Sequence, residues 1–315
     1  MRKIRKPQKP LADVNVGERE ADGTRKVVAC FWPNLGKLRD GTSTRAILAI
    51  DGSSSMQMEY GFGQILVAQP VNYVQQAARR LGRILGITSG ANEVLMFYWA
   101  LGDGSDTSRI GQFDAAGCEN VEISGPRENQ WGTGTRLLNA LKVCIESDYS
   151  TSDRTIAIII TDGVFEDEKA CVEYCLGIGY KINDGNHKPV NFYLLGVGNN
   201  VDKEQLQRLD DMFIGTDLDG KIDLFSHGLF NSLADVDDEL VTAAIYAELM
   251  TEDIMVGPAC RILSGDGGKA SEVLCDFSGG LPGKIEFRLP DGARSFTVDS
   301  GSVRATQDVS EVIDS

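Results

Sequence analysis

Residues 45–55 of the chain read RAILAIDGSSS, an apolar run that ends abruptly in a polar cluster. Residues 156–163 read IAIIITDG and end in the same way. Short runs rich in isoleucine are typical of strands buried on both faces of a parallel sheet. Because ligands bind outside the carboxyl ends of such strands, Asp51 and Asp162 are predicted to meet at one site.

Apolar strand-like runs alternate with helical patterns from residue 45 onward. Further strands are predicted at 94–100, 191–197 and 221–225, with an edge hairpin over 102–113, and helices at 70–85, 135–145, 167–176, 203–209 and 236–250. This alternation predicts βαβ units and therefore an α/β fold, in which helices cover both faces of a mostly parallel sheet.

The two ends of the chain differ from this central part. Residues 1–24 are charged, polar and without periodicity, which predicts a disordered tail, and residues 25–42 are expected to form a strand and a loop. Residues 251–303 contain short apolar runs between Gly, Asp and Pro turns, which predicts a small antiparallel β unit. Since that unit alone would bury little surface, we expect residues 25–32 to pack with it. Residues 304–315 are expected to be a second tail.

Composition restricts the class of protein. The 315 residues are 42% hydrophobic and 24% charged, as in ordinary globular proteins, and no apolar run approaches the roughly 20 residues of a membrane span. The net charge of −15 disfavours binding to nucleic acid or to anionic lipid. The seven cysteines lie mostly within apolar runs, which predicts buried, reduced thiols and a cytoplasmic protein.

The polar clusters have the composition of a site for a hard cation. Side chains two apart in an extended stretch share a face, so Asp51, Ser53 and Ser55 can present three oxygens to one point. Asp162 arrives from the second strand, and the GTGT segment at 132–135 brings a threonine hydroxyl. Such oxygens suit Mg²⁺, with Mn²⁺ or Ca²⁺ as alternatives. Since hydroxyls coordinate a cation without neutralising it, a carboxylate from outside the chain could complete the shell.

These three motifs, in this order, resemble the metal-ion-dependent adhesion site of von Willebrand factor A (vWA) domains over residues 43–250. The resemblance implies a Rossmann-like sheet of strand order 3-2-1-4-5-6 and a protein partner that offers an Asp or Glu carboxylate to the metal. It also implies that ligand binding is linked to movement of the helix at 236–250. The segment at 195–211 is similar to the intracellular tellurium-resistance and copine-like branch of these domains. By resemblance, the metal ligands are Asp51, Ser53, Ser55, Thr133 and Asp162.

We therefore expect a non-enzymatic, metal-dependent protein-interaction module, which could be a subunit of a multi-protein complex. One alternative is a structural subunit of a larger assembly whose metal only rigidifies the site loops. A Mg²⁺-dependent hydrolase is disfavoured, because His187 and His227 stand outside the motifs and no Gly-x-Ser-x-Gly elbow is present.

Overall fold

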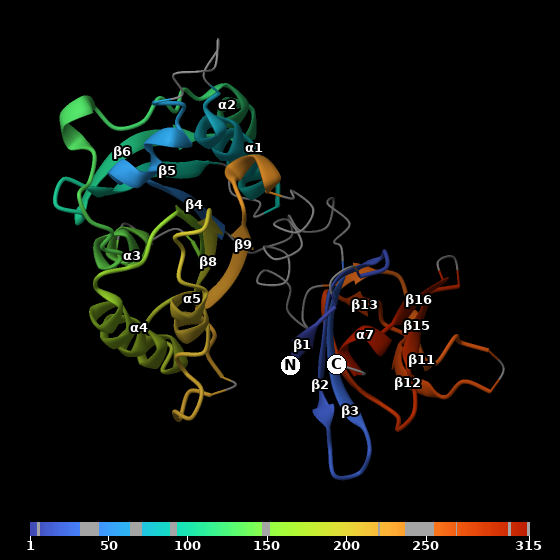
Figure 1. Cartoon of the computed structure of the whole chain (residues 1–315). Helices are drawn as coiled ribbons and strands as arrows, with labels where there is room; N and C mark the ends of the chain where they lie inside the picture. Colours follow the sequence, from blue (N-terminus) through green and yellow to red (C-terminus); the bar gives the residue numbers. More distant parts are fainter. Residues whose placement is uncertain are drawn as a thin grey trace. The chain divides into compact units, whose positions relative to one another are not determined.

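The computed structural model describes residues 1–4, 7–31, 44–63, 71–88, 93–146, 152–219, 221–236, 255–268, 270–301 and 304–313. The chain divides into two compact units, shown in Figure 1. The α/β unit is Gly41–Val241, and the β unit combines Met1–Asp40 with Thr242–Ser315. Within the described residues, no helix is both long and apolar enough to cross a membrane.

The α/β unit is built on one six-stranded sheet, ordered β6-β5-β4-β7-β8-β9. All neighbouring strands are parallel except the edge pair β5 and β6, which is antiparallel. Counted along this unit, the order is 3-2-1-4-5-6, so the predicted fold class is confirmed. The strands are β4 (Thr44–Asp51), β5 (Val94–Leu101), β6 (Asp106–Phe113), β7 (Arg154–Thr161), β8 (Val190–Val197) and β9 (Phe225–Phe230).

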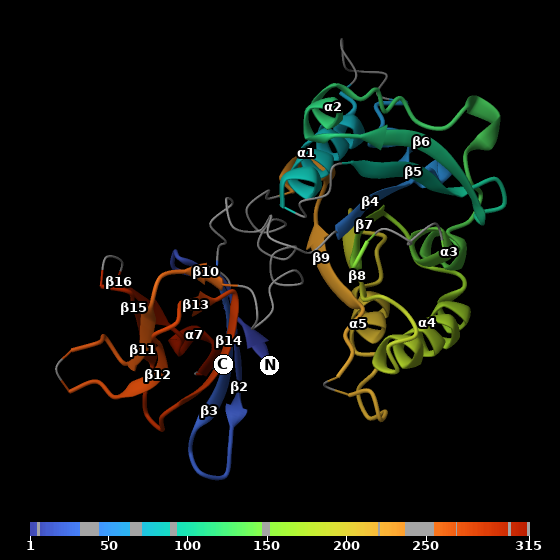
Figure 2. The ribbon, with the colours of Figure 1, turned by 180° about the vertical axis from the view of Figure 1, so that it is seen from behind.

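Helices cover both faces of this sheet, as the views in Figures 1 and 2 show. Helices α1 and α2 lie on one face, and α3, α4 and α5 lie on the other. The four central strands β5, β4, β7 and β8 therefore bury both faces, which explains their continuous apolar runs. The helices are α1 (Tyr73–Thr88), α2 (Ala115–Asn120), α3 (Leu138–Glu146), α4 (Glu168–Asn183) and α5 (Lys203–Asp210), with 3-10 turns η1 (Ser54–Met58), η2 (Glu128–Gln130) and η3 (Leu233–Asp235).

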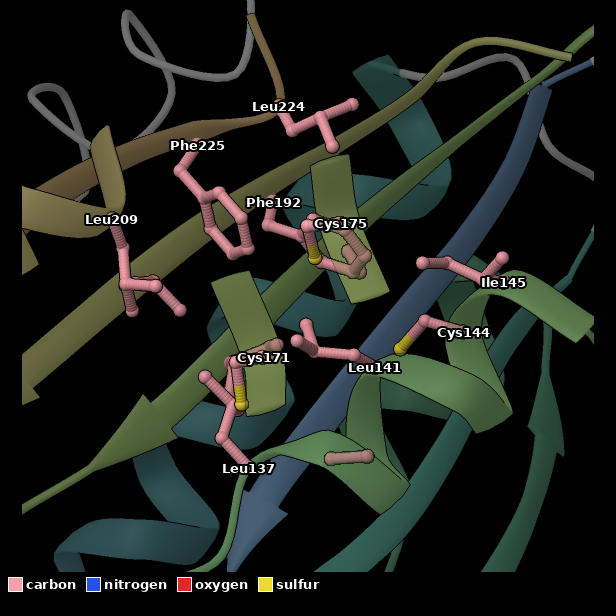
Figure 3. Packing of buried hydrophobic residues seen from close by; sticks show 14 of the residues in the cluster. Leu137, Leu141, Cys144, Ile145, Cys171, Cys175, Phe192, Leu209, Leu224 and Phe225 are labelled. Atoms are coloured by element: carbon pink, nitrogen blue, oxygen red, sulfur yellow. The ribbon is translucent and has the colours of Figure 1, made fainter. Parts of the chain in front are cut away.

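Three cysteines pack in the core between α3, α4 and the sheet (Figure 3). Cys144, Cys171 and Cys175 are fully buried among side chains such as Leu141 and Phe192. Burial raises the pKa of the Cys144 and Cys175 thiols to about 12, and raises that of Cys171 still further. These thiols therefore act as small hydrophobic side chains.

The β unit is made of antiparallel sheets, and strands from both ends of the chain share one of them. The sheets are ordered β1-β2-β3-β14, β12-β11-β15-β16 and β10-β13. Strand β3 pairs with β14, so residues 25–31 join the C-terminal strands. In the core of this unit, the ring centroids of Phe287 and Phe296 lie 5.0 Å apart. The elements are β1 (Arg2–Lys3), β2 (Leu11–Arg19), β3 (Arg25–Phe31), β10 (Met255–Gly257), β11 (Cys260–Ser264), β12 (Val273–Phe277), β13 (Leu281–Pro282), β14 (Lys284–Leu289), β15 (Ser295–Asp299), β16 (Arg304–Asp308) and α7 (Ser310–Ile313).

Both predicted tails are corrected by these strands. Residues 1–24 contain β1 and β2, and β2 buries Leu11, Val14 and Val16 against the rest of the unit. Residues 304–315 contain β16 and α7, which buries Val312. In both segments a few apolar side chains reach a core supplied by distant parts of the chain, so local polarity was misleading.

Two element boundaries also differ from the prediction. The sixth strand runs over Phe225–Phe230 instead of 221–225. Helix α4 continues past its predicted end at residue 176, through Gly177 and Gly179, to Asn183. Gly179 is needed there because a Cβ would lie 2.6 Å from the ring of Phe213. The helix predicted at 236–250 lies outside the described residues, apart from Val236.

Candidate functional site

Four of the five predicted site residues meet at the carboxyl ends of β4 and β7. Asp51 is the last residue of β4, and Asp162 directly follows β7. The two strands are parallel neighbours, so their ends lie side by side. Ser53 and Ser55 sit in the turn that leaves β4 and enters η1.

A continuous set of hydrogen bonds links the two carboxyl groups. The backbone N–H of Ser53 donates to Asp51 Oδ1 at 2.8 Å. The hydroxyl oxygens of Ser53 and Ser55 are 3.0 Å apart, and Ser55 Oγ donates to Asp162 Oδ1 at 2.8 Å. The oxygens of Asp51, Ser53, Ser55 and Asp162 thus converge as the sequence predicted. We call these four residues the oxygen cluster.

Two further residues position Asp51 and were not assigned a role from the sequence. The hydroxyl of Thr161 donates to Asp51 Oδ2 at 2.9 Å, and the phenol of Tyr60 donates to the Asp51 carbonyl at 3.0 Å. Both side chains are buried. A sequence signal existed for Thr161, a polar residue at the end of an apolar strand. None existed for Tyr60, because its position depends on the path of η1.

The loop that carries Thr133 lies beside the oxygen cluster through its backbone. Gly132 forms a parallel bridge with Ser53, and its carbonyl accepts from the backbone N–H of Ser54 at 2.9 Å. A side chain at Gly132 would overlap the carbonyl oxygen of Ala100, so only glycine allows this approach. The exposed hydroxyl of Thr133 donates to the carbonyl of Gly102 at 3.3 Å instead of to the cluster.

Electrostatics disfavours two charged carboxylates at this position. Burial, followed by repulsion from Asp162, raises the pKa of Asp51 to about 7, although hydrogen bonds from Ser53 and Thr161 oppose the shift. Burial also raises the pKa of Asp162, against the hydrogen bond from Ser55. Since like charges in a desolvated site are unfavourable, the cluster favours either a proton or a cation.

The donor set is limited to oxygen. Within the parts of the chain that the structure describes, no group of three or more His, Cys, Asp or Glu side chains could hold a metal ion. An ion at the oxygen cluster would therefore depend on serine hydroxyls as well as on two carboxylates. Both histidines have other contacts: His187 Nδ1 lies 2.6 Å from the carbonyl of Lys188, and His227 Nδ1 lies 2.9 Å from Asp210 Oδ2.

Comparisons with known proteins give only distant structural similarities. No family model matches the sequence, and no curated protein matches it. The PilB minor pilin from Streptococcus sanguinis is 10% identical, with a TM-score of 0.43 over 75% of this chain and 78% of that chain. The SpRpn10 VWA domain is 12% identical, with a TM-score of 0.37 over 65% of this chain and 94% of that domain.

A third similar structure is an aerotolerance-related membrane protein from Bacteroides fragilis NCTC 9343. It is 16% identical, with a TM-score of 0.36 over 66% of this chain and 98% of that chain. At such low identities and TM-scores, these similarities assign neither a ligand nor an activity to this chain.

Proposed function

We propose that the α/β unit is a vWA-type interaction module that holds a divalent cation at the oxygen cluster and binds a partner protein through an Asp or Glu side chain. The observation that carries this proposal is the convergence of two buried carboxyls, Asp51 and Asp162, with two serine hydroxyls at adjacent strand ends. The resemblance of the three sequence motifs supports the same function.

The residues present fit Mg²⁺ in chemistry. Mg²⁺ prefers oxygen ligands at about 2.0–2.1 Å and usually keeps some water molecules. Asp51, Ser53, Ser55 and Asp162 would hold the ion, and Mn²⁺ or Ca²⁺ are the alternatives. Thr133 would join them if its hydroxyl left the carbonyl of Gly102. A bound dication would supply positive charge for an incoming carboxylate.

We further propose that the module is non-enzymatic and cytoplasmic. Engagement of His187 and His227 outside the oxygen cluster supports the first point, because neither stands as a general base there. The cytoplasmic location is supported by the seven cysteines, which are all free thiols and of which six are buried. The sequence similarity at 195–211 supports the intracellular tellurium-resistance and copine-like branch.

Calorimetry on the full chain tests this function with two probes, Mg²⁺ alone and a peptide whose single Asp stands between serines. We expect Mg²⁺ to bind, and the peptide to bind only when Mg²⁺ is present. Asp51→Asn, which keeps the side-chain shape, should lose both interactions. Glu173→Gln on the exposed face of α4 is the matched control and should change neither.

Two outcomes would contradict the proposal. Peptide binding that persists in EDTA would exclude a role for the cation in recognition. A Mg²⁺-dependent rise in melting temperature without any peptide binding would favour the alternative, in which the ion only rigidifies the loops of a structural subunit.

A further inference from the structure

Exposed apolar side chains stand on the same loops as the oxygen cluster. Phe62 follows η1 and is 48% exposed, and Val164, two positions after Asp162, is 47% exposed. Met58 at the end of η1 is 67% exposed. Exposed apolar side chains on the loops of a polar site are available to contact a ligand bound there. We call Phe62 and Val164 the apolar flanks of the site.

The first apolar flank is held in place by a series of aromatic contacts. The ring of Phe62 meets that of Trp131 edge-on, with centroids 5.6 Å apart, and Trp131 meets Tyr60 in the same way at 5.1 Å. Tyr60 in turn donates to the carbonyl of Asp51. The exposed ring of Phe62 is therefore positioned relative to the oxygen cluster by the fold itself.

The two flanks lie on two different loops, both of which carry residues of the oxygen cluster. Tyr60 also contacts Tyr98 of β5, at a ring distance of 6.4 Å, so the aromatic series is on the β5 side of β4. Val164 precedes Phe165, whose backbone N–H donates at 2.7 Å to Gln205 of α5, the helix that follows β8. Because β4 and β7 are adjacent strands, a ligand at Asp51 and Asp162 would lie between the two loops that carry the apolar flanks.

The charges near the Thr133 loop disfavour a strongly acidic ligand. Arg136 is held between two exposed carboxylates, 2.9 Å from Asp103 and 3.4 Å from Glu166. Two negative groups around one guanidinium leave a net negative charge there, on a chain whose net charge is already −15. A second acidic residue on the ligand would meet repulsion.

We infer that the partner presents one Asp or Glu between bulky apolar side chains, rather than a run of acidic residues. The inference rests on the proposed function, since the central carboxylate needs a cation at the oxygen cluster. The apolar neighbours of that carboxylate would cover Phe62 and Val164. The apolar flanks would then determine which peptide sequences bind, and the carboxylate would fix the position of the peptide on the site.

Three synthetic peptides test this inference on the full chain by calorimetry, each with a central Asp. The neighbours of the Asp are Phe and Leu in the first peptide, serines in the second and glutamates in the third. With Mg²⁺, we expect the first peptide to bind about tenfold or more tightly than the second, which is the factor expected from covering one large apolar side chain. The third should bind most weakly.

Variants of the flanks provide the control within the protein. Phe62→Ser and Val164→Ser should each reduce the preference for the apolar peptide several-fold, while Mg²⁺ affinity and binding of the serine peptide stay unchanged. Ile214→Ser is the matched control: Ile214 is 66% exposed, and its neighbour Phe213 packs on Gly179, in the half of α4 that is remote from the site. It should leave all three affinities unchanged.

Each other outcome has a distinct meaning. Equal Mg²⁺-dependent affinities for the three peptides would overturn the inference and leave the proposed function standing. Preference for the apolar peptide that persists in EDTA would overturn the proposed function and the need for a central carboxylate. Failure of all three peptides to bind would overturn both.

Discussion

Ser55 donates a 2.8 Å hydrogen bond to Asp162, although 107 positions separate the two residues along the chain. The bond joins the turn after β4 to the turn after β7. With the Ser53–Ser55 hydroxyl contact and the Ser53 backbone N–H, it connects the Asp162 and Asp51 carboxyl groups. This link is the most direct observation that the scattered sequence motifs form one site.

Removal of the Ser55 hydroxyl is predicted to weaken Mg²⁺ binding. Ser55→Ala should lower Mg²⁺ affinity about tenfold, because it removes one oxygen ligand and frees the Asp162 carboxyl. Ser54→Ala is the control, since Ser54 is exposed and its hydroxyl donates to the carbonyl of Gly132 instead. Calorimetric titration measures both. Equal losses of Mg²⁺ affinity in the two variants would show that the conformation of the turn, and not the Ser55 hydroxyl, determines binding.

The raised pKa of Asp51 predicts a pH dependence of stability in the absence of divalent cations. Its ordinary value is 3.8, and in the folded chain the pKa is about 7. The folded state thus holds a proton that the unfolded state has released, so this stabilisation is complete below about pH 4 and is lost as pH rises through about 7. In EDTA, the melting temperature of the wild type should fall over this window relative to that of Asp51→Asn.

Mg²⁺ should reverse this dependence if it binds at the oxygen cluster. A cation stabilises the charged carboxyl, so the wild-type melting temperature at neutral pH should rise with added Mg²⁺ while that of Asp51→Asn stays constant. A wild-type curve that parallels the variant curve at every pH in EDTA would show that Asp51 does not titrate in this window.

The close approach at Gly132 predicts a strong effect on stability. A methyl group there would overlap the Ala100 carbonyl, so Gly132→Ala should lower the free energy of unfolding by more than about 2 kcal/mol. Gly177→Ala is the matched control, because a Cβ at Gly177 meets nothing within 4 Å in helix α4. It should be neutral or stabilising by up to about 1 kcal/mol. Denaturant unfolding measures both variants.

In the β unit, truncating a buried side chain is predicted to cost much more stability than truncating an exposed one. Phe287 is 5% exposed and packs on Phe296, so Phe287→Ala should destabilise this unit by about 3–5 kcal/mol. Val273→Ala on strand β12 is the control, since Val273 is 50% exposed, and it should change stability by less than about 0.5 kcal/mol. Calorimetric scans of the two variants measure both changes in stability.

Much of the α/β unit was predictable because its four central strands are buried on both faces. An apolar run as continuous as that of β7 is typical of a strand inside a parallel sheet, and the Asp that follows it marks the carboxyl end. The convergence of Asp51 and Asp162 follows from the sheet order alone. The direction of the Thr133 hydroxyl does not, because it depends on the acceptor that the neighbouring loop presents, here the carbonyl of Gly102.

The β unit was harder to predict because its pairings are remote in sequence. Val14 and Val16 are buried, but the alternation around them is short and lies among charged residues. Their burial depends on a core completed by strands more than half the chain away, such as β14. The hydrogen bond from Tyr60 to the Asp51 carbonyl likewise depends on tertiary packing.

The pairing of β3 with β14 has a consequence for biosynthesis. A ribosome releases β1, β2 and β3 before the α/β unit, but β14, which completes their sheet, emerges only after that unit. The nascent α/β unit can thus fold while the edge of β3 is still open to solvent or to a chaperone. Only translation through β14 closes that edge, so strands synthesised before the α/β unit belong to a unit that is completed after it.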